Sequence, residues 1–492
     1  RRRGSCVDVA DFVRWLAGSS RSVEPEDPGA RGPGRHLVLN FDINKTIVMS
    51  DSATGKSMAD IANHVLALSA WGSAAGADAG ADPAWRCEVS EPSVERPRPG
   101  LLSYAEFLEA RFPGPSGKER RERLWHRFTL PGDPGEALRP HCDAFLAALR
   151  LPAGVAGTEA ARAAGLQGEE VFIVPAFFEL LLHLKRAGAS FTLVFRTFGT
   201  DLREVATEFN AFCEGRHPLF PGAVLDGRDG APDYRVALDR SSAFGTFFRS
   251  SLSGEDDALV WGTLRQPRPG EGGLELYADA KEFPDVRVVS GGLGAVYRDL
   301  RRRTREPGTL ALRDYFPFWR AQGMGADPGK LNGGKLMVVD PHPSSEVHEV
   351  FFDDNVLYTA PRIVDARLAR LPGKVLSMRY LAPCHLVRAE PLLAVGDRGY
   401  FTRHVERLRA AYGRRLAALA RLRDLCCAAQ PAGALTQACT RPLPLGAEGY
   451  DPWAGLREDA RKHSKAAAFA EPEEEVSAPD STAGAAGAAA GR

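Results

Sequence analysis

Short apolar runs alternate with amphipathic helical patterns along this chain, and this alternation constrains the fold more than any other feature. The clearest unit has a helical apolar face at 176–186, a stop at Gly188 and a buried-strand run at 191–195. Similar strand runs are expected at 36–41, 336–339 and 347–352. Strands that alternate with helices form a parallel sheet covered by helices. The pattern predicts an α/β fold with a Rossmann-like, three-layer core built on a parallel sheet.

The length of the chain predicts large insertions in that core. At 492 residues, the chain exceeds the size that one hydrophobic core usually supports. Residues 1–35 are expected to form an N-terminal segment and linker, because 17–35 are rich in Ser, Pro, Gly and Arg. We assign the core to three stretches, which are 36–50, 171–214 and 330–425.

Two insertions are predicted to separate these core stretches. Helical patterns indicate a mostly helical cap at 51–170; they cover 58–68, 104–111, 119–128 and 142–149. A second, mixed insertion is expected at 215–329. Residues 426–492 are assigned to a C-terminal extension, whose last 25 or so residues are rich in alanine, glycine and acids and are expected to be disordered.

Charge and composition exclude several classes of partner. Lysine plus arginine equals aspartate plus glutamate at 63 each, so no overall charge draws the chain to nucleic acid or to an anionic membrane. No run approaches the roughly 18 apolar residues of a membrane span. The 8 cysteines lack the spacing of a zinc site or a disulfide framework. We therefore expect a cytoplasmic protein that meets any charged ligand locally.

Polar residues follow the predicted strands at points that a parallel sheet brings together. They are Asp42, Asn44 and Thr46, then Thr197, then Lys335, and finally Asp353 and Asp354. Ligands of open α/β sheets bind beyond the carboxyl ends of the strands. An ionised aspartate can attack phosphorus, further carboxylates can hold Mg²⁺, and hydroxyl and ammonium groups can stabilise phosphoryl oxygens. This set of residues favours phosphoryl transfer.

These motifs resemble those of the haloacid dehalogenase superfamily, which are DxDx[T/V] after a strand, a strand-ending Ser or Thr, a Lys, and a strand-ending acidic pair. The first motif is similar to HLVLNFDINKT at 36–46, and the fourth to VFFDDN at 350–355. The second is similar to FTLVFRT at 191–197, together with the helix and glycine before it. For the third motif Lys335 fits best, and Lys330 is the alternative.

The resemblance implies a role for each of these residues. Asp42 would be the nucleophile that forms an aspartyl-phosphate, Thr197 would bind the phosphoryl group, and Lys335 would stabilise the intermediate. Asp42, Asp353 and Asp354 would ligate Mg²⁺ together with the backbone carbonyl of Asn44. The implied substrate is a small phosphorylated molecule. Dehalogenation is a poorer fit, because that chemistry needs no metal.

Asn44 departs from the family pattern. Family phosphatases carry a second aspartate here, which protonates the leaving group and then deprotonates the water that splits the aspartyl-phosphate. An amide cannot carry that proton, and loss of a general acid or base typically removes about 10²- to 10⁴-fold of rate. Three outcomes stay open: a slow phosphatase, a phosphotransferase with a long-lived intermediate, and a phosphate-binding or scaffold protein that no longer turns over.

A glycine turn at 290–294 suggests a different ligand. A strand-like run at 286–289 precedes it, a helical pattern follows, and Asp314 comes about 20 residues later, which outlines a dinucleotide-binding turn. Tyr297, however, stands where the third glycine of that motif allows close helix packing. Plain structural roles remain alternatives throughout: a tight turn here, a turn-forming Asp42, a solvated Lys335, and a solvated helix face for the arginines at 301–303.

Overall fold

The computed structural model describes most of the chain between residues 35 and 428. The described ranges are 35–49, 55–75, 84–238, 242–268, 270–279, 281–325, 333–341, 345–358, 362–369 and 371–428. The expectations for residues 1–34, for Lys330 as the alternative lysine and for 429–492 lie outside these ranges. Within them, no helix combines the length and the apolar character that crossing a membrane requires.

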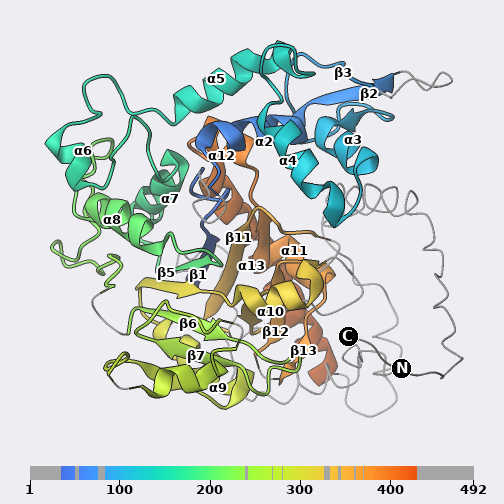
Figure 1. Cartoon of the computed structure of the whole chain (residues 1–492). Coiled ribbons are helices and arrows are strands. Elements are labelled where there is room, and N and C mark those ends of the chain that lie inside the picture. The colour runs from blue at the N-terminus through green and yellow to red at the C-terminus, as the bar shows by residue number, and fades with distance from the viewer. Residues whose placement is uncertain are drawn as a thin grey trace, which may run out of the picture.

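An eight-stranded sheet forms the centre of the fold, and β1 lies in its interior (Figure 1). The strand order is β14-β11-β1-β5-β9-β6-β7-β8; neighbours are parallel from β14 to β6 and antiparallel from β6 to β8. The prediction of an α/β fold with a mainly parallel sheet is confirmed. The strands are β1 (His36–Asp42), β5 (Phe191–Thr197), β6 (Phe244–Phe248), β7 (Ala258–Trp261), β8 (Arg287–Val289), β9 (Gly308–Arg313), β11 (Val347–Asp353) and β14 (Leu386–Arg388).

The central strands are buried on both faces, which explains why their sequences are nearly continuous apolar runs. Successive side chains of a strand point to opposite faces. In β1, Leu37, Leu39 and Phe41 therefore pack into the larger core on one face, whereas Val38 packs into a second core on the other. A single strand thus contributes to two cores.

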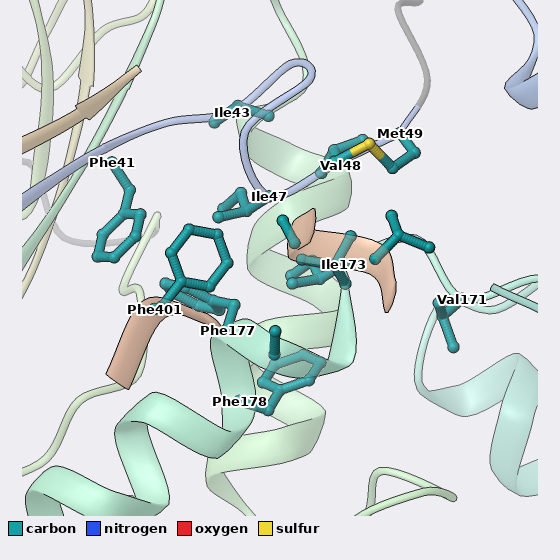
Figure 2. Packing of buried hydrophobic residues seen from close by; sticks show 14 of the residues in the cluster. Phe41, Ile43, Ile47, Val48, Met49, Val171, Ile173, Phe177, Phe178 and Phe401 are labelled. Carbon is teal, nitrogen blue, oxygen red and sulfur yellow. The ribbon is translucent and has the colours of Figure 1, made fainter. Parts of the chain in front are cut away.

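Helices α7, α8 and α13 contribute most of the helical side chains to the first face. The ring of Phe41 contacts Phe177 of α7 and Phe401 of α13, with ring centroids 5.0 and 5.5 Å away (Figure 2). Such edge-to-face contacts are favourable beyond the area they bury. They fix the end of β1 immediately before Asp42. The helices near this face are α7 (Pro175–Arg186), α8 (Leu202–Cys213), α12 (Pro391–Gly396) and α13 (Tyr400–Ala428).

A small three-stranded sheet and α9 cover the second face. Its order is β10-β12-β13, and Leu336 and Val338 of β10 pack with Leu293 of α9 against Val38. The third layer of the predicted core is therefore part sheet and part helix, and β10 does not join the main sheet. The elements here are β10 (Lys335–Val339), β12 (Val364–Leu368), β13 (Leu371–Val375), α9 (Gly292–Arg303), α10 (Phe316–Ala321) and α11 (Met378–His385).

The stretch predicted as a helical cap contains five helices in its described residues and also a small antiparallel sheet of order β3-β2-β4. Ser57 and Ser103 begin α2 and α3 with capping boxes, in which the serine and the acid three residues later satisfy each other's backbone N–H. The elements are α2 (Met58–Ser69), β2 (Trp71–Ala75), β3 (Ala84–Cys87), β4 (Leu102–Ser103), α3 (Tyr104–Arg111), α4 (Lys118–His126), α5 (Arg139–Ala148) and α6 (Glu159–Ala163).

The stretch at 215–329 differs from the insertion expected there. It supplies β6, β7, β8 and β9 to the main sheet, and β9 pairs in parallel with β5 along Thr192–Thr197. The apolar run of β9 is only Leu310 to Leu312, between a threonine and an arginine, so it lacks the long apolar signal of β1 or β5. The strands on both sides of the expected boundary between 214 and 215 therefore belong to the same sheet.

Candidate active site

The order in which the chain adds strands to the sheet reverses at β1. The candidate site lies at this switch point. From β1 the chain adds β5 and later β9 on one side, and it then returns to place β11 on the other side. Crevices at such a switch point, beyond the carboxyl ends of the strands, are the usual ligand sites of open α/β sheets. Asp42 ends β1 and Asp353 ends β11, so both carboxylates lie at this switch point.

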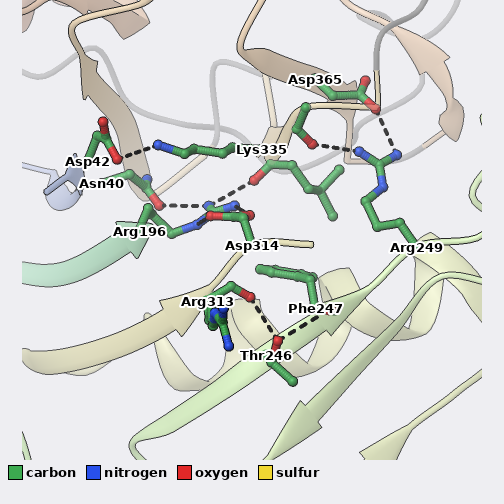
Figure 3. A network of polar contacts seen from close by, with 12 residues as sticks. Asn40, Asp42, Arg196, Thr246, Phe247, Arg249, Arg313, Asp314, Lys335 and Asp365 are labelled. Atoms are coloured by element: carbon green, nitrogen blue, oxygen red, sulfur yellow. Dashed lines mark hydrogen bonds and ion pairs between the residues drawn. The ribbon is translucent and has the colours of Figure 1, made fainter. Parts of the chain in front are cut away.

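Lys335 joins the two carboxylates. Its Nζ donates to Oδ1 of Asp42 at 2.5 Å (Figure 3). It also donates to Oδ2 of Asp353 at 2.7 Å. The lysine is the first residue of β10 and is 2% exposed, so the small sheet delivers it to the edge of the large one. The prediction that Lys335, Asp42 and Asp353 lie together agrees with this geometry, whereas a solvated loop lysine does not.

The three groups change one another's proton affinity. Burial raises the pKa of Asp42 well above its ordinary value; Lys335 opposes this, while Asp353 and Asp354 add to it. Burial likewise raises the pKa of Asp353. For Lys335 burial favours the neutral amine, but Asp353 and Asp42 outweigh burial and raise its pKa. The lysine is therefore a firmly protonated cation between two acids that are costly to ionise together.

Asp354 completes an acidic cluster. One carboxylate oxygen from each of Asp42, Asp353 and Asp354 lies within 4.8 Å of the others, and among the described residues this is the group with the spacing of a metal site. Lys45 pairs with Asp354 at 2.7 Å, which leaves three carboxylates facing two ammonium groups. A divalent cation with oxygen ligands would offset this excess of negative charge, so the residues present fit Mg²⁺.

The loop after β1 is fixed by both apolar and polar contacts. Ile43, Ile47 and Val48 are fully buried and anchor the loop in the first core (Figure 2). Thr46 is also buried, and its hydroxyl accepts a hydrogen bond from the N–H of Asp354 at 3.2 Å. The loop that carries the candidate nucleophile is thus tied directly to the loop that carries the acidic pair.

Asn44 directs its side chain toward a carboxylate that sequence reasoning missed. Its Nδ2 donates to Oδ2 of Asp201 at 3.2 Å, while its Oδ1 is buried and accepts no hydrogen bond from the described residues. Asp201 occupies the N-cap position of α8 without capping the helix through its side chain, so its carboxylate remains at the site. The Gly-Thr-Asp sequence after β5, typical of a helix start, was the available signal for this residue.

Thr197 lies beside this pair. Its hydroxyl accepts a hydrogen bond from the N–H of Gly199 at 2.8 Å. A Cβ at position 199 would lie 2.7 Å from Oδ2 of Asp201, 3.3 Å from the Thr197 hydroxyl and 3.4 Å from Nδ2 of Asn44, so only glycine allows these three groups to converge. The predicted residues thus form two neighbouring groups, one around Lys335 and one around Gly199.

Arg196 is a second residue whose role the sequence did not reveal. It is 2% exposed and donates to both carboxylate oxygens of Asp314, at 2.9 and 2.5 Å. It also donates to the carbonyl of Leu336 at 2.9 Å and to Oδ1 of Asn40 at 3.3 Å (Figure 3). Because Leu336 follows Lys335, this arginine holds the start of β10 against the main sheet.

The geometry around the glycine turn at 290–294 favours a tight turn over a dinucleotide site. A Cβ on Gly292 would lie 2.5 Å from the carbonyl of Glu255, and the N–H of Leu293 donates to the carbonyl of Gly254 at 2.8 Å. The absence of a side chain at Gly292 therefore allows the segment at 254–255 to pack against the turn. Asp314, which would have bound a ribose, is buried in its pair with Arg196.

The chain was also compared with known proteins. No family model, no curated protein and no solved structure gave a significant match.

Proposed function

We propose that this chain is an atypical member of the haloacid dehalogenase superfamily, a Mg²⁺-dependent phosphohydrolase that forms an aspartyl-phosphate on Asp42. The observation that carries the proposal is the position of Lys335, whose Nζ is shared by Asp42 and Asp353. A buried ammonium group in hydrogen-bond contact with a nucleophilic carboxylate can stabilise the phosphoryl oxygens that arrive there. The substrate would be a small phosphorylated molecule.

Mg²⁺ would be held by Asp42, Asp353, Asp354 and the backbone carbonyl of Asn44, and it would offset the repulsion between these acids and a phosphate. The protein residues would do the remaining work. Asp42 would attack phosphorus in line with the leaving group, Lys335 would neutralise charge on the phosphoryl oxygens, and Thr197 would hold the group by its hydroxyl. The leaving group would depart as its P–O bond breaks. Asn44 has no proton to exchange, so water would split the aspartyl-phosphate and free the phosphate only slowly.

A second candidate function is a phosphate-binding or scaffold protein that no longer turns over. The observation that favours it is the amide of Asn44, which hydrogen-bonds Asp201 and supplies no acid or base at that position. Both candidates predict capture of a phosphate-like ligand. They differ in whether the captured group is released.

The decisive experiment separates capture from release. Beryllium fluoride mimics an acyl-phosphate, and with Mg²⁺ it is expected to raise the melting temperature of the parent but not of Asp42→Asn. Asp143→Asn is the control, because this acid is exposed on the cap helix α5. A parent that shows no Mg²⁺-dependent stabilisation by beryllium fluoride contradicts both candidates.

Release is tested by hydrolysis of para-nitrophenyl phosphate. Asn44→Asp is expected to raise the turnover number by about 10²-fold or more, because it restores a proton carrier. The double variant with Asp42→Asn should lose all of this gain. Capture without turnover, in the parent and in Asn44→Asp alike, would favour the phosphate-binding candidate.

A further inference from the structure

Arg313, at the carboxyl end of β9, has no carboxylate partner among the residues that the structure describes. It stands in register with Thr197 on the neighbouring strand β5. Side chains at one register position of parallel strands point to the same face of the sheet. Arg313 therefore lies beside the Thr197 hydroxyl, and on the opposite side of β9 from the pair formed by Asp314 and Arg196 (Figure 3).

The polar contacts of Arg313 leave most of its guanidinium unused. Its Nη1 donates to the carbonyl of Leu264 at 3.0 Å. Its Nε is buried and donates to no atom of the described residues. Among those residues no carboxylate lies within 4.0 Å of it, whereas the buried arginines Arg196, Arg249 and Arg367 each have such a partner. A half-buried guanidinium of this kind is arranged to receive an anion.

The electrostatics agree with this geometry. Burial lowers the pKa of Arg313, and the nearby Tyr277 and Asp201 only partly offset the effect. An anion placed against the guanidinium would restore the charge balance that the protein leaves incomplete.

The position of β9 indicates which part of a ligand Arg313 can reach. Asp42 pairs with Arg196 on β5, and Arg196 pairs with Leu312 on β9. Arg313 therefore lies two strand spacings from Asp42, roughly 10 Å, and one residue farther toward the carboxyl end. Because successive side chains leave opposite faces of a sheet, a ligand that reaches both residues would pass over the carboxyl ends of the strands. The phosphoryl group at Asp42 would already be in contact with Lys335, and β5 with Thr197 stands between. Arg313 is therefore suited to a different group of the same ligand.

We propose that Arg313 binds a second anionic group, a carboxylate or a phosphate, on the substrate whose phosphoryl group is bound at Asp42. This inference rests on the proposed function, and it narrows the substrate class to small phosphate esters that carry another acid. Arg313 sets the specificity of the site and takes no part in the transfer step.

The test compares ligands that differ in one group. Binding of butyl phosphate, 4-(phosphonooxy)butanoate and butane-1,4-diyl bisphosphate is measured by calorimetry with Mg²⁺ present. The parent is expected to bind at least one of the two acidic ligands tenfold or more tightly than butyl phosphate, and the preferred one identifies the second group as carboxylate or phosphate. In Arg313→Gln this ratio should fall to about one, because glutamine keeps a donor for the Leu264 carbonyl but lacks the charge.

Two further variants separate the possible failures. Arg313→Lys should retain part of the preference, and Arg287→Met, which removes an arginine from the far strand β8, should retain all of it. Equal binding of the three ligands by the parent, or an unchanged ratio in Arg313→Gln, overturns the role of Arg313 while leaving the phosphate site standing. A parent that binds none of them with Mg²⁺ overturns the proposed function and this inference together.

Discussion

Two clusters of cations and carboxylates differ in charge balance, and Figure 3 shows Lys335 with Asp42 from one and Arg249 with Asp365 from the other. Around Arg249, two arginines face two acids: Arg249 pairs with Asp257 and Asp365, and Arg367 pairs with Asp365. Around Lys335, three acids face two lysines. The charges of the first cluster balance, although Oδ1 of Asp257 accepts no hydrogen bond from the described residues. The second cluster carries one excess negative charge, which agrees with the cation site that we propose there.

The proton affinities of the acids reflect the same difference. Burial would raise the pKa of Asp365, but Arg249 and Arg367 outweigh burial and lower it. The pKa of Asp42 and of Asp353 is instead raised, because their single shared lysine does not outweigh burial and the neighbouring acids. Burial also raises the pKa of Asp257, which Arg249 only partly offsets, so it is the ionised form of Asp365, held by two arginines, that distinguishes the first cluster from the second.

The largest predicted effect is the loss of stability when Arg249 is removed from the balanced cluster. Arg249→Met leaves Asp257 buried without its arginine and Asp365 with Arg367 alone, and it removes the hydrogen bond to the carbonyl of Gly334 at 2.8 Å. The free energy of unfolding should fall by roughly 3–5 kcal/mol, as when one partner is removed from a buried ion pair. Urea denaturation measures this. A loss below about 1 kcal/mol would mean that the cluster is hydrated and that the comparison does not hold.

A second prediction concerns Glu349 of β11, whose pKa burial raises to about 8 against the opposing effects of Arg301 and Asn40. The folded state therefore holds a proton on this carboxyl between about pH 4.5 and pH 8, where the unfolded state has lost it. The resulting stabilisation is full below pH 4.5 and is lost as the pH rises through 8.

Glu349→Gln removes this dependence. The difference in free energy of unfolding, variant minus parent, should increase by about 2 kcal/mol between about pH 5 and about pH 9. This figure is smaller than the full pKa shift implies, because the side chain is only half-buried. Parallel stability curves for the variant and the parent over this range would contradict a raised pKa at Glu349.

The smallest expected effect has the opposite sign to that of Arg249→Met. Asp42→Asn removes one of three crowded acids and keeps the shape of the side chain, so the free energy of unfolding at neutral pH should rise by about 1 kcal/mol without Mg²⁺. With Mg²⁺ the parent should recover the advantage, because only the parent retains all three carboxylates. Destabilisation of Asp42→Asn comparable to that of Arg249→Met would remove the distinction between the two clusters.

Much of the site could be predicted because strand ends and site residues coincide. The runs before Asp42, Thr197 and Asp353 are apolar on both faces, so their position inside a parallel sheet follows from sequence, and the edge at which they meet follows from the fold. Lys335 was recognisable as a residue at the start of a strand. Its delivery from a separate sheet was not, because a buried strand has the same pattern in any sheet.

The remaining features depend on contacts between distant segments. The apolar run of β9 is too short to distinguish this strand from a loop. Arg313, which ends the strand, was therefore not predicted as a site residue. The contact of Asp201 with Asn44 joins residues 157 positions apart, and that of Arg249 with Asp365 joins residues 116 apart. No local pattern carries such pairings, because each depends on how distant segments of the chain meet in the assembled fold.

The distance along the chain between Asp42 and Lys335, 293 positions, also has a consequence for biosynthesis. At translation speeds of about 5–20 residues per second, the ribosome adds Lys335 roughly 15–60 seconds after Asp42. Throughout that interval β1 has no β11 to pair with, and the acid at its end has no ammonium group beside it. The nascent protein would therefore assemble the cluster of Asp42, Lys335 and Asp353 only after the segment from Lys335 to β11 has been made, and a chain that ends earlier would lack the cluster.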